Sequence, residues 1–450
     1  MGVELFLSAY DPLDLPSGSI DPLGFERGYL ILAEKLLPGL TNVADRPRYF
    51  SVLCAGAYLA DKAHGEGLRR EPPRKQYEQR HKYVLRMERL WALACVLAAE
   101  QNGQEPAGLR GVTYAKNRLE ILGRQGRTST TPDYKLLSRQ TAYGVLGIYG
   151  TVAENLRLLD KKTLNLTPAL GWTLAEGFLK ETKADLHIRT AVMNGSEVGL
   201  AKLANWGARV HINGDFTPTE ARCLATGLRQ DHTRFTMAEL LARHPYRDQK
   251  EDDLSRLQRV FADVARRGGE YAYFVDTISC ILAYEQAYRW AQLGFERMLW
   301  LCRRAPGGRL PVAELATDPV FARVRREMPQ AAADFLKTRA ACTTDELRQE
   351  LGKLDDVGAF LQAAAVCSAE ARALAGEILA RHRDVQRGKF EHGSGRGKLP
   401  WIESSDDGHL QLTSARVGGL GFEARALEDI SGHPYRLVAA DELYRATRWS

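Results

Sequence analysis

Apolar residues recur at helical spacing along most of the chain, and proline or glycine interrupts the pattern at intervals. Helices are therefore predicted over residues 23–37, 47–58, 76–100, 221–229, 269–303 (one helix or two), 320–328, 344–365 and 368–387. Two of them begin with the pattern of a capping box, Thr217–Glu220 and Thr343–Glu346. Only the last fifty residues alternate like short strands, at 409–413 and 435–438. The pattern predicts a mainly α-helical protein with a small β-containing C-terminal piece.

The segment Leu136–Lys180 has a distinctive order of elements. Two amphipathic stretches, 138–149 and 152–159, precede the charged turn Asp160–Lys162, and a polar and β-branched run then leads to Pro168, which can start a helix. This order resembles a winged helix, in which the last wing strand runs into a helix that packs on the core. The alternative is ordinary core helices joined by a tight turn. A winged helix could also bind protein instead of DNA, because a fold does not fix a function.

The length and the breaks in the pattern together predict a multidomain protein. The expected parts are an N-terminal helical domain with a basic helix, a winged-helix-like domain, a second helical domain, and a basic loop with the β-containing end piece. Their expected bounds are 1–125, 126–185, 186–390 and 391–450.

Positive charge is concentrated in one region. The whole chain carries a formal charge of +6, whereas residues 64–139 alone hold fifteen lysines and arginines against eight acids, a charge of +7. A basic segment that runs into a winged-helix-like one is typical of nucleic-acid binders. The alternative is a solvated helix face on which arginines pair with the interspersed glutamates.

On the first interpretation, several cations are candidate phosphate contacts in the basic segment, on the wing turn and in a late Gly-rich loop. They are Arg69, Arg70, Arg74, Lys75, Arg80, Lys82, Arg124, Arg127, Lys161, Lys162, Arg387, Lys389, Arg396 and Lys398. The late loop also contains Gly393–Lys398, but it lacks the spacing and the Ser or Thr of a nucleotide-binding P-loop.

The block Leu36–Phe50, LLPGLTNVADRPRYF, resembles the N-terminal helical hairpin of poorly characterised bacterial families from phage-defence gene clusters. The matching residues are Leu37, Pro38, Gly39, Thr41, Arg46, Arg48 and Tyr49. The resemblance implies a subunit of a multi-protein defence system. A structural role for Arg46 and Arg48 is favoured, in which they cap carbonyls of the preceding helix or anchor the turn.

Seven dispersed cysteines without a C-x-x-C pair predict reduced core thiols in a cytoplasmic protein, and the first residues lack the features of a secretory signal. No recognised catalytic, cofactor or metal motif is found. His244 with its neighbours does not fit a phospholipase-type nuclease motif. Asp133, Glu181 and Lys183 could in principle form a degenerate metal-dependent nuclease site.

The sequence therefore favours a non-catalytic DNA-binding or scaffolding subunit without cofactor or metal. DNA would be held through its phosphates, alongside protein partners of a larger complex and without a membrane. The alternatives are a degenerate nuclease subunit and an adaptor whose basic faces meet acidic protein partners.

Overall fold

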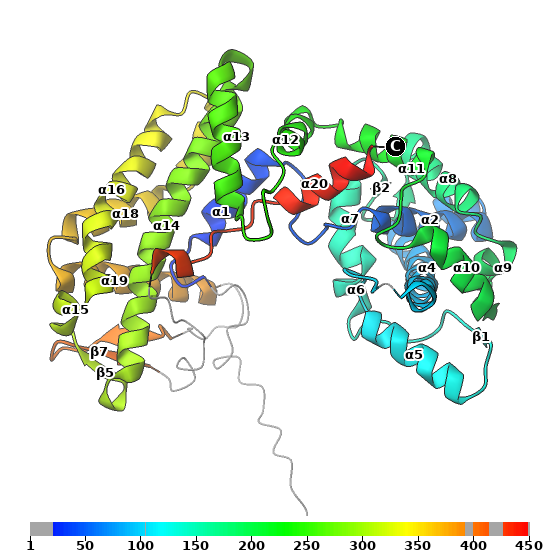
Figure 1. The fold of residues 1–450 in the computed structure, drawn as a ribbon, viewed down its shortest axis with the longest axis horizontal. Helices are drawn as coiled ribbons and strands as arrows, with labels where there is room; N and C mark the ends of the chain where they lie inside the picture. The colour runs from blue at the N-terminus through cyan, green and yellow to red at the C-terminus, as the bar shows by residue number, and fades with distance from the viewer. Residues whose placement is uncertain (1–20, 104, 392–398, 414–425, 449–450) are drawn as a thin grey trace, which may run out of the picture. The chain divides into compact units, whose positions relative to one another are not determined.

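The computed structural model describes residues 21–103, 105–391, 399–413 and 426–448 (Figure 1). The chain forms two compact units. Unit 1 comprises the described residues of Met1–Leu36 and Tyr246–Tyr435, and unit 2 those of Leu37–Pro245 and Arg436–Ser450. Both units are built mainly from helices, which confirms the predicted mainly α, multidomain class. No helix of the described residues is long and apolar enough to cross a membrane.

Unit 2 holds the basic segment and the winged-helix-like segment. Its helices are α2 (Arg48–His64), α3 (Gly67–Arg70), α4 (Pro73–Asn102), α5 (Val112–Arg124), α6 (Gln140–Tyr143), α7 (Val145–Asn155), α8 (Thr173–Glu181), α9 (Leu186–Asn194), α10 (Leu200–Val210), α11 (Pro218–Leu228), α12 (His232–Arg243) and α20 (Leu437–Ala446). Its two small antiparallel sheets are β1 (Ser129–Thr130) with β4 (Val198–Gly199), and β2 (Leu159–Asp160) with β3 (Asn165–Leu166).

Helix α4 forms the centre of unit 2, packed between α2 and α10. Every residue from Leu90 to Val96 is buried, so this half of the helix is enclosed on all sides, as its continuous apolar run predicts. The indole of Trp91 donates a hydrogen bond to the carbonyl of Val210 at 2.8 Å. Gly207 of α10 allows the close approach of the two helices, because a Cβ at this position would collide with the carbonyl of Ala94.

Residues 140–181 contain two helices, a hairpin and a helix in this order, but the first two helices differ from the predicted stretches 138–149 and 152–159. α6 ends at Tyr143, α7 runs from Val145 to Asn155, and β2 begins at Leu159. Pro168 opens a five-residue π-helical turn, Pro168–Trp172, that leads directly into α8. The strand pair β1 and β4 joins this part of the chain to residues beyond 185. The division into two units thus differs from the four consecutive segments expected from the sequence.

Unit 1 contains the longest helix of the described residues. Its helices are α1 (Glu26–Leu36), α13 (Asp253–Arg267), α14 (Ala272–Arg304), α15 (Glu314–Thr317), α16 (Pro319–Ala341), α17 (Asp345–Gly352), α18 (Asp355–Cys367) and α19 (Ala371–Glu391). Short 3-10 turns lie at Gly269–Tyr271, Pro306–Gly308 and Leu427–Asp429. One three-stranded antiparallel sheet has the order β5 (Arg309–Pro311), β7 (His409–Leu412), β6 (Ile402–Ser404).

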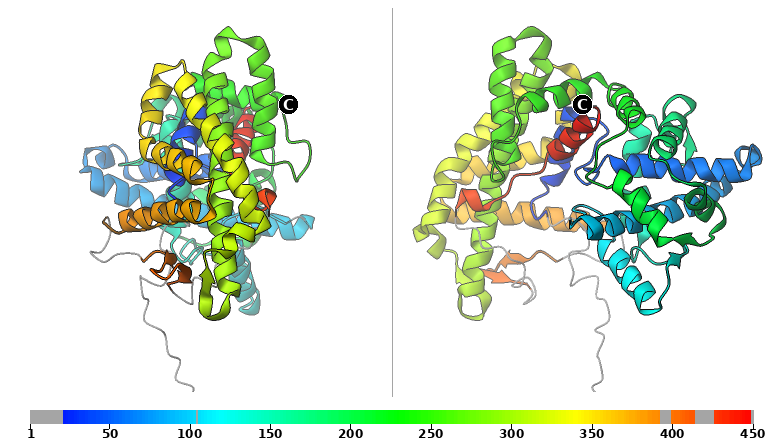
Figure 2. Two further views of the ribbon diagram at one scale, coloured as in Figure 1. Left: turned by 90° about the vertical axis from the view of Figure 1, so that its left-hand side faces the viewer. Right: turned by 45° about the vertical axis from the view of Figure 1, so that its right-hand side comes forward.

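Helix α14 is the core of unit 1, and Figures 1 and 2 show it running beside α16. The hydroxyl of Tyr284, fully buried on α14, donates to the carbonyl of Phe25 at 2.6 Å. The stretch predicted as one helix or two is therefore one helix, preceded by a short 3-10 turn. Residues 344–365, expected as one helix, form two, α17 and α18.

Two further local predictions have opposite outcomes. The capping box at Thr217 and Glu220 is formed at the start of α11. The one at Thr343 and Glu346 is not: the hydroxyl of Thr343 donates to Asp276 at 2.7 Å, and Glu346 pairs with a lysine of α1. Tertiary partners compete successfully with the local cap there.

The C-terminal β piece is confirmed in β7, but the strand expected at 435–438 is wrong, because α20 begins at Leu437. All seven cysteines are free, and only Cys367 is not buried.

Candidate nucleic-acid interface

Four of the predicted phosphate contacts lie around the start of α4, and all four are exposed. Each pairs with a nearby acid: Arg69 with Asp61, Arg70 with Glu66, Arg74 with Glu78 and Lys75 with Glu71. The separations range from 2.8 to 4.0 Å. Arg70 and Arg74 thus form arginine–glutamate pairs of the alternative interpretation. The pairs of Arg70, Arg74 and Lys75 are exposed on both sides and weak, at about 0–1 kcal/mol, so a phosphate can compete with the acid. The partner of Arg69, Asp61, is buried.

Arg80 cannot contact a phosphate, and its assignment was wrong. Its side chain is fully buried, with Nε 2.8 Å from the carboxylate of Asp61. Nη1 donates to the carbonyl of Thr163 at 3.1 Å. A buried guanidinium needs such partners because an uncompensated charge in the interior is costly. Arg80 instead joins α4 to α2 and to the turn between β2 and β3.

The other predicted contacts of unit 2 are exposed but scattered. Arg124 and Arg127 pair with Glu120 and Glu197 respectively. Lys82 is exposed and has no ion pair among the described residues.

Lys161 and Lys162 lie on the exposed turn between β2 and β3. The ammonium of Lys161 donates to the hydroxyl of Thr151, in the second half of α7, at 2.5 Å. The predicted position on a hairpin turn is therefore observed, and Lys162 is left facing solvent.

The last predicted contacts belong to unit 1. Arg387 is exposed on α19, 3.9 Å from Asp384. Arg396, Lys398 and the side chain of Lys389 lie outside the described residues. The fourteen predicted cations thus fall in two units, and the described contacts do not assemble them into one site.

A shallow groove in unit 2 does gather part of the basic segment. It lies between the middle of α4, the segment 131–139 and α6, and its volume is about 450 Å³. The lining residues are Leu85, Arg89, Asp133, Tyr134, Lys135, Leu137, Ser138, Gln140 and Thr141. We call this feature the α4–α6 groove.

The cations of the groove are held in different ways. Arg89 is fixed in the wall, because its Nε donates to Gln140 at 2.9 Å and its Nη1 to the carbonyl of Pro132 at 3.3 Å. Lys135 is exposed, with its ammonium 5.7 Å from the ring centre of Tyr114. Arg139, the residue before α6, does not line the groove but lies next to Ser138, which does; it is also exposed and has no ion pair among the described residues. Lys135 and Arg139 therefore offer positive charge to solvent, whereas Arg89 is held by hydrogen bonds.

A buried carboxylate lies behind this wall. Glu88 accepts a hydrogen bond from Gln140 at 2.6 Å and another from the backbone N–H of Val145, the first residue of α7, at 2.7 Å. Burial raises the pKa of Glu88 to about 7, and these two hydrogen bonds partly oppose the rise. Gln140 therefore connects Arg89 of the groove to an acid that titrates near neutral pH.

No family model, curated protein or solved structure matches this chain.

The residues proposed for a degenerate nuclease site have separate partners. Asp133 contacts Arg86 at 3.3 Å, whereas Glu181 accepts a hydrogen bond from the backbone of Thr219 at 3.2 Å. Burial alone would raise the pKa of Glu181, but hydrogen bonds from Thr217 and Thr219 outweigh it, so its pKa is lowered. Within the described ranges, no group of three or more His, Cys, Asp or Glu side chains could hold a metal ion.

Sequence reasoning counted Arg89, Lys135 and Arg139 in the basic segment but did not single them out. For Lys135 and Arg139 the available signal was their position just before the start of a helix. Their exposure, which separates them from Arg80, depends on tertiary packing and has no local signature. Arg89 lies within α4, where no such signal exists.

Proposed function

We propose that unit 2 binds double-stranded DNA through its phosphates, as a non-catalytic subunit of a multi-protein bacterial defence system. The observation that carries the proposal is the division of charge between the units. The sequence range of unit 2, residues 37–245 and 436–450, holds 33 lysines and arginines against 22 acids, a formal charge of +11. The range of unit 1, residues 1–36 and 246–435, holds 29 against 34, a charge of −5. An excess of this size on one compact body favours a polyanionic partner.

Five exposed cations give the proposal a location. They lie on α4, in the segment before α6 and on the β2–β3 turn, and they have no ion pair among the described residues: Lys82, Lys135, Arg139, Lys161 and Lys162. We call them the α7 cations. Arg139 lies at the start of α6, and Lys161 contacts Thr151 in the second half of α7. Five exposed cations can neutralise up to about five phosphates of a duplex.

The local fold supports the same role. Helices α6 and α7, the β2–β3 hairpin and α8 follow each other in the order of a winged helix, with two lysines on the hairpin turn. Contacts to phosphates fix the position of a protein on DNA but carry no sequence information. The proposed binding is therefore independent of base sequence. The place in a defence system rests on the resemblance of Leu36–Phe50 to families from such gene clusters.

Fluorescence anisotropy with a labelled duplex of about thirty base pairs tests the proposal over a range of salt concentrations. Five neutralised phosphates correspond to a slope of about −4.5 in log affinity against log salt. The triple variant Lys82→Ala, Lys135→Ala, Arg139→Ala should reduce the slope by about three units. A triple variant of exposed arginines in unit 1, Arg266→Ala, Arg326→Ala, Arg348→Ala, removes the same charge and should leave the slope unchanged.

Equal effects of the two triple variants would show that total charge, and not this surface, governs binding. No binding at low salt would reject the DNA proposal and favour acidic protein partners for the basic faces. Degradation of the duplex with magnesium would instead support a nuclease subunit.

A further inference from the structure

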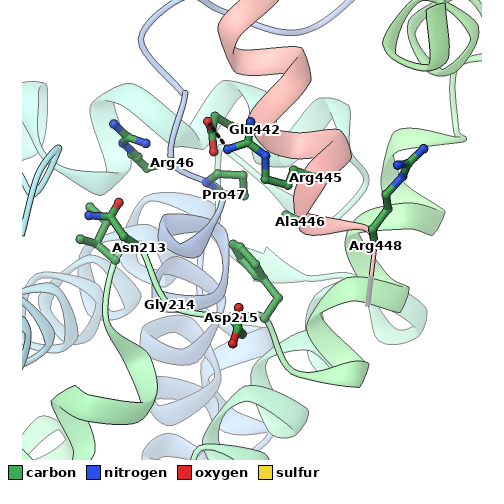
Figure 3. Close-up of a pocket in the computed structure, with 11 residues that line it drawn as sticks. Arg46, Pro47, Asn213, Gly214, Asp215, Glu442, Arg445, Ala446 and Arg448 are labelled. Carbon is green, nitrogen blue, oxygen red and sulfur yellow. Dashed lines mark hydrogen bonds and ion pairs between the residues drawn. The ribbon is translucent and has the colours of Figure 1, made fainter. Parts of the chain in front are cut away.

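A second cavity in unit 2 is separate from the α4–α6 groove and shares no residue with it. Its volume is about 480 Å³, and it lies between the start of α2, the loop that precedes α11, and the end of α20 (Figure 3). Its lining includes Arg46, Asn213, Asp215, Phe216, Glu442, Arg445 and Arg448. Three arginines from two distant parts of the chain thus line one cavity together with two acids.

Arg48 fixes the backbone of the cavity loop that precedes α11. Nη2 of Arg48 donates to the carbonyls of Gly214, at 3.1 Å, and Asp215. The same guanidinium lies 4.4 Å from the ring centre of Phe216. Because Arg48 is fully buried, the loop does not depend on a ligand for its shape. Arg48 occupies one face of the Phe216 ring, while Phe216 itself lines the cavity.

Arg46 is the least satisfied cation of the cavity. It is partly buried, and its Nε has no hydrogen-bond partner and negligible exposure. The side chain passes so close to Gly108 that a Cβ at that position would collide with Nε. Nε therefore faces protein atoms and not the cavity. No ion pair of Arg46 is found among the described residues. Arg46 still brings a positive charge without a counter-ion to the lining, and an anion in the cavity would supply one.

Arg445 on α20 is the second cation, and Figure 3 shows it with Glu442 across the cavity from Asn213. Nη1 of Arg445 donates to Glu442 at 2.9 Å. Arg445 is 73% exposed, so its pair with Glu442 is weak, and the remaining nitrogens of its guanidinium are free to bind an oxyanion.

The remaining groups indicate what the anion is attached to. Phe216 offers an aromatic surface on which a base can stack. The amide nitrogen of Asn213 donates to the carbonyl of Ala107 at 3.3 Å, which leaves its oxygen as an acceptor for an amino group. A cavity of this size lies within the range of small-molecule sites, about 300–1,000 Å³.

We infer that this cavity binds a nucleoside monophosphate. Arg46 and Arg445 hold the phosphate, Phe216 stacks with the base, and Asn213 contacts the base edge. The two acids, Asp215 and Glu442, limit the net charge of the lining to +1, which suits a single phosphate better than a polyphosphate chain. The inference does not depend on DNA binding, because none of the α7 cations lines this cavity.

Isothermal titration calorimetry of the full chain with AMP tests the inference, with adenosine and inorganic phosphate as separate probes. AMP should bind at least about tenfold more tightly than either probe, since each lacks one half of the recognised ligand. Arg46→Gln and Arg445→Gln should each weaken AMP binding about tenfold. Glu442→Gln should instead tighten it several fold, because it removes a negative charge that competes for Arg445. A general loss of structure could not produce these opposite directions.

Arg124→Gln is the matched control, since Arg124 is an equally exposed arginine paired with a glutamate of its own helix. It should leave the affinity unchanged. The inference is overturned if AMP does not bind at millimolar concentration or if inorganic phosphate binds as tightly as AMP. It is also overturned if Arg445→Gln, which replaces an exposed guanidinium by a neutral amide, binds AMP like the unmodified protein.

Discussion

Arg48 and Glu220 form an ion pair in unit 2 in which Nη1 lies 2.8 Å from the carboxylate and both side chains are fully buried. The two residues are 172 positions apart in the sequence. The hydroxyl of Ser51 adds a further hydrogen bond to Glu220 at 2.6 Å. Through its capping box with Thr217, Glu220 also fixes the start of α11. The pair therefore connects the start of α2 to α11, which lies far along the sequence.

Glu220→Gln should destabilise the protein by about 3 kcal/mol or more, because the charge of Arg48 would remain buried without a counter-ion. Arg48→Met should destabilise the protein similarly, because the charge of Glu220 would then remain buried without a counter-ion. The double variant Arg48→Met, Glu220→Met should cost less than the sum of the single changes. Urea unfolding followed by circular dichroism measures the free energies. Glu120→Gln, which opens the exposed pair with Arg124, should change stability by less than about 1 kcal/mol.

Arg80 and Lys82 lie two positions apart on α4 and should respond in opposite ways. Arg80→Ala should lower the unfolding free energy by about 3–5 kcal/mol, since the buried charge of Asp61 would keep only the exposed Arg69, 3.8 Å away, as a partner. Lys82→Ala should leave stability within about 0.5 kcal/mol, because the side chain is exposed. In the anisotropy assay, Lys82→Ala should lower the salt slope by about one unit. A stable Arg80→Ala protein with a reduced salt slope would contradict the structural role of Arg80.

Glu88 should make the stability of unit 2 dependent on pH. Its pKa is raised from 4.5 to about 7 in the folded protein, so the folded state holds a proton that the unfolded chain has already released. The stabilisation is complete below about pH 4.5 and is lost as the pH rises through about 7. Between about pH 4.5 and 7, the titration of Glu88 should lower the free energy of unfolding by up to about 1.4 kcal/mol per pH unit.

The measurement is the difference in unfolding free energy between the unmodified protein and Glu88→Gln, which cannot titrate. This difference should decrease from about pH 5 to about pH 7 and then become constant. Hydrogen exchange of the amides at the start of α7 gives a local readout, because Val145 donates to Glu88. A difference that does not vary with pH would show that Glu88 has an ordinary pKa.

Two glycines on helices of unit 2 should give opposite results when changed to alanine. Gly207→Ala places a methyl group against the carbonyl of Ala94 and should destabilise the protein by about 1–3 kcal/mol as α10 is pushed from α4. At Gly123 on α5, a Cβ would meet no atom within 4 Å. Gly123→Ala should therefore stabilise by up to about 1 kcal/mol through helix propensity. Thermal unfolding of both variants tests the pair, and a neutral Gly207→Ala would show that the two helices can separate at little cost.

The prediction from sequence was most successful where the physical rule is local. Apolar periodicity correctly predicted α2, α4 and α14, because the 3.6-residue repeat of a helix is visible in the spacing of nearby residues. The capping box at Thr217 formed because both of its hydrogen bonds lie within one turn. The same rule failed at Thr343, where Asp276 on α14 supplies a competing acceptor.

The candidate site was predicted only in part. The basic segment and the lysines of the hairpin turn could be read from charge alone, whereas the exposure of Lys135 and the burial of Arg80 could not. The cavity that contains Arg46 and Arg445 had no sequence signal, since its walls come from positions about four hundred residues apart.

The sequence by itself determined the helical class, most of the helices and the concentration of positive charge, because each follows from residue type and short-range spacing. Tertiary structure alone decided the composition of the two units and the identity of the buried ion pairs. It also decided which cations face solvent. The physical reason is that burial and pairing depend on side chains brought together from distant segments, and one charged residue is locally indistinguishable from another until its neighbours in space are known.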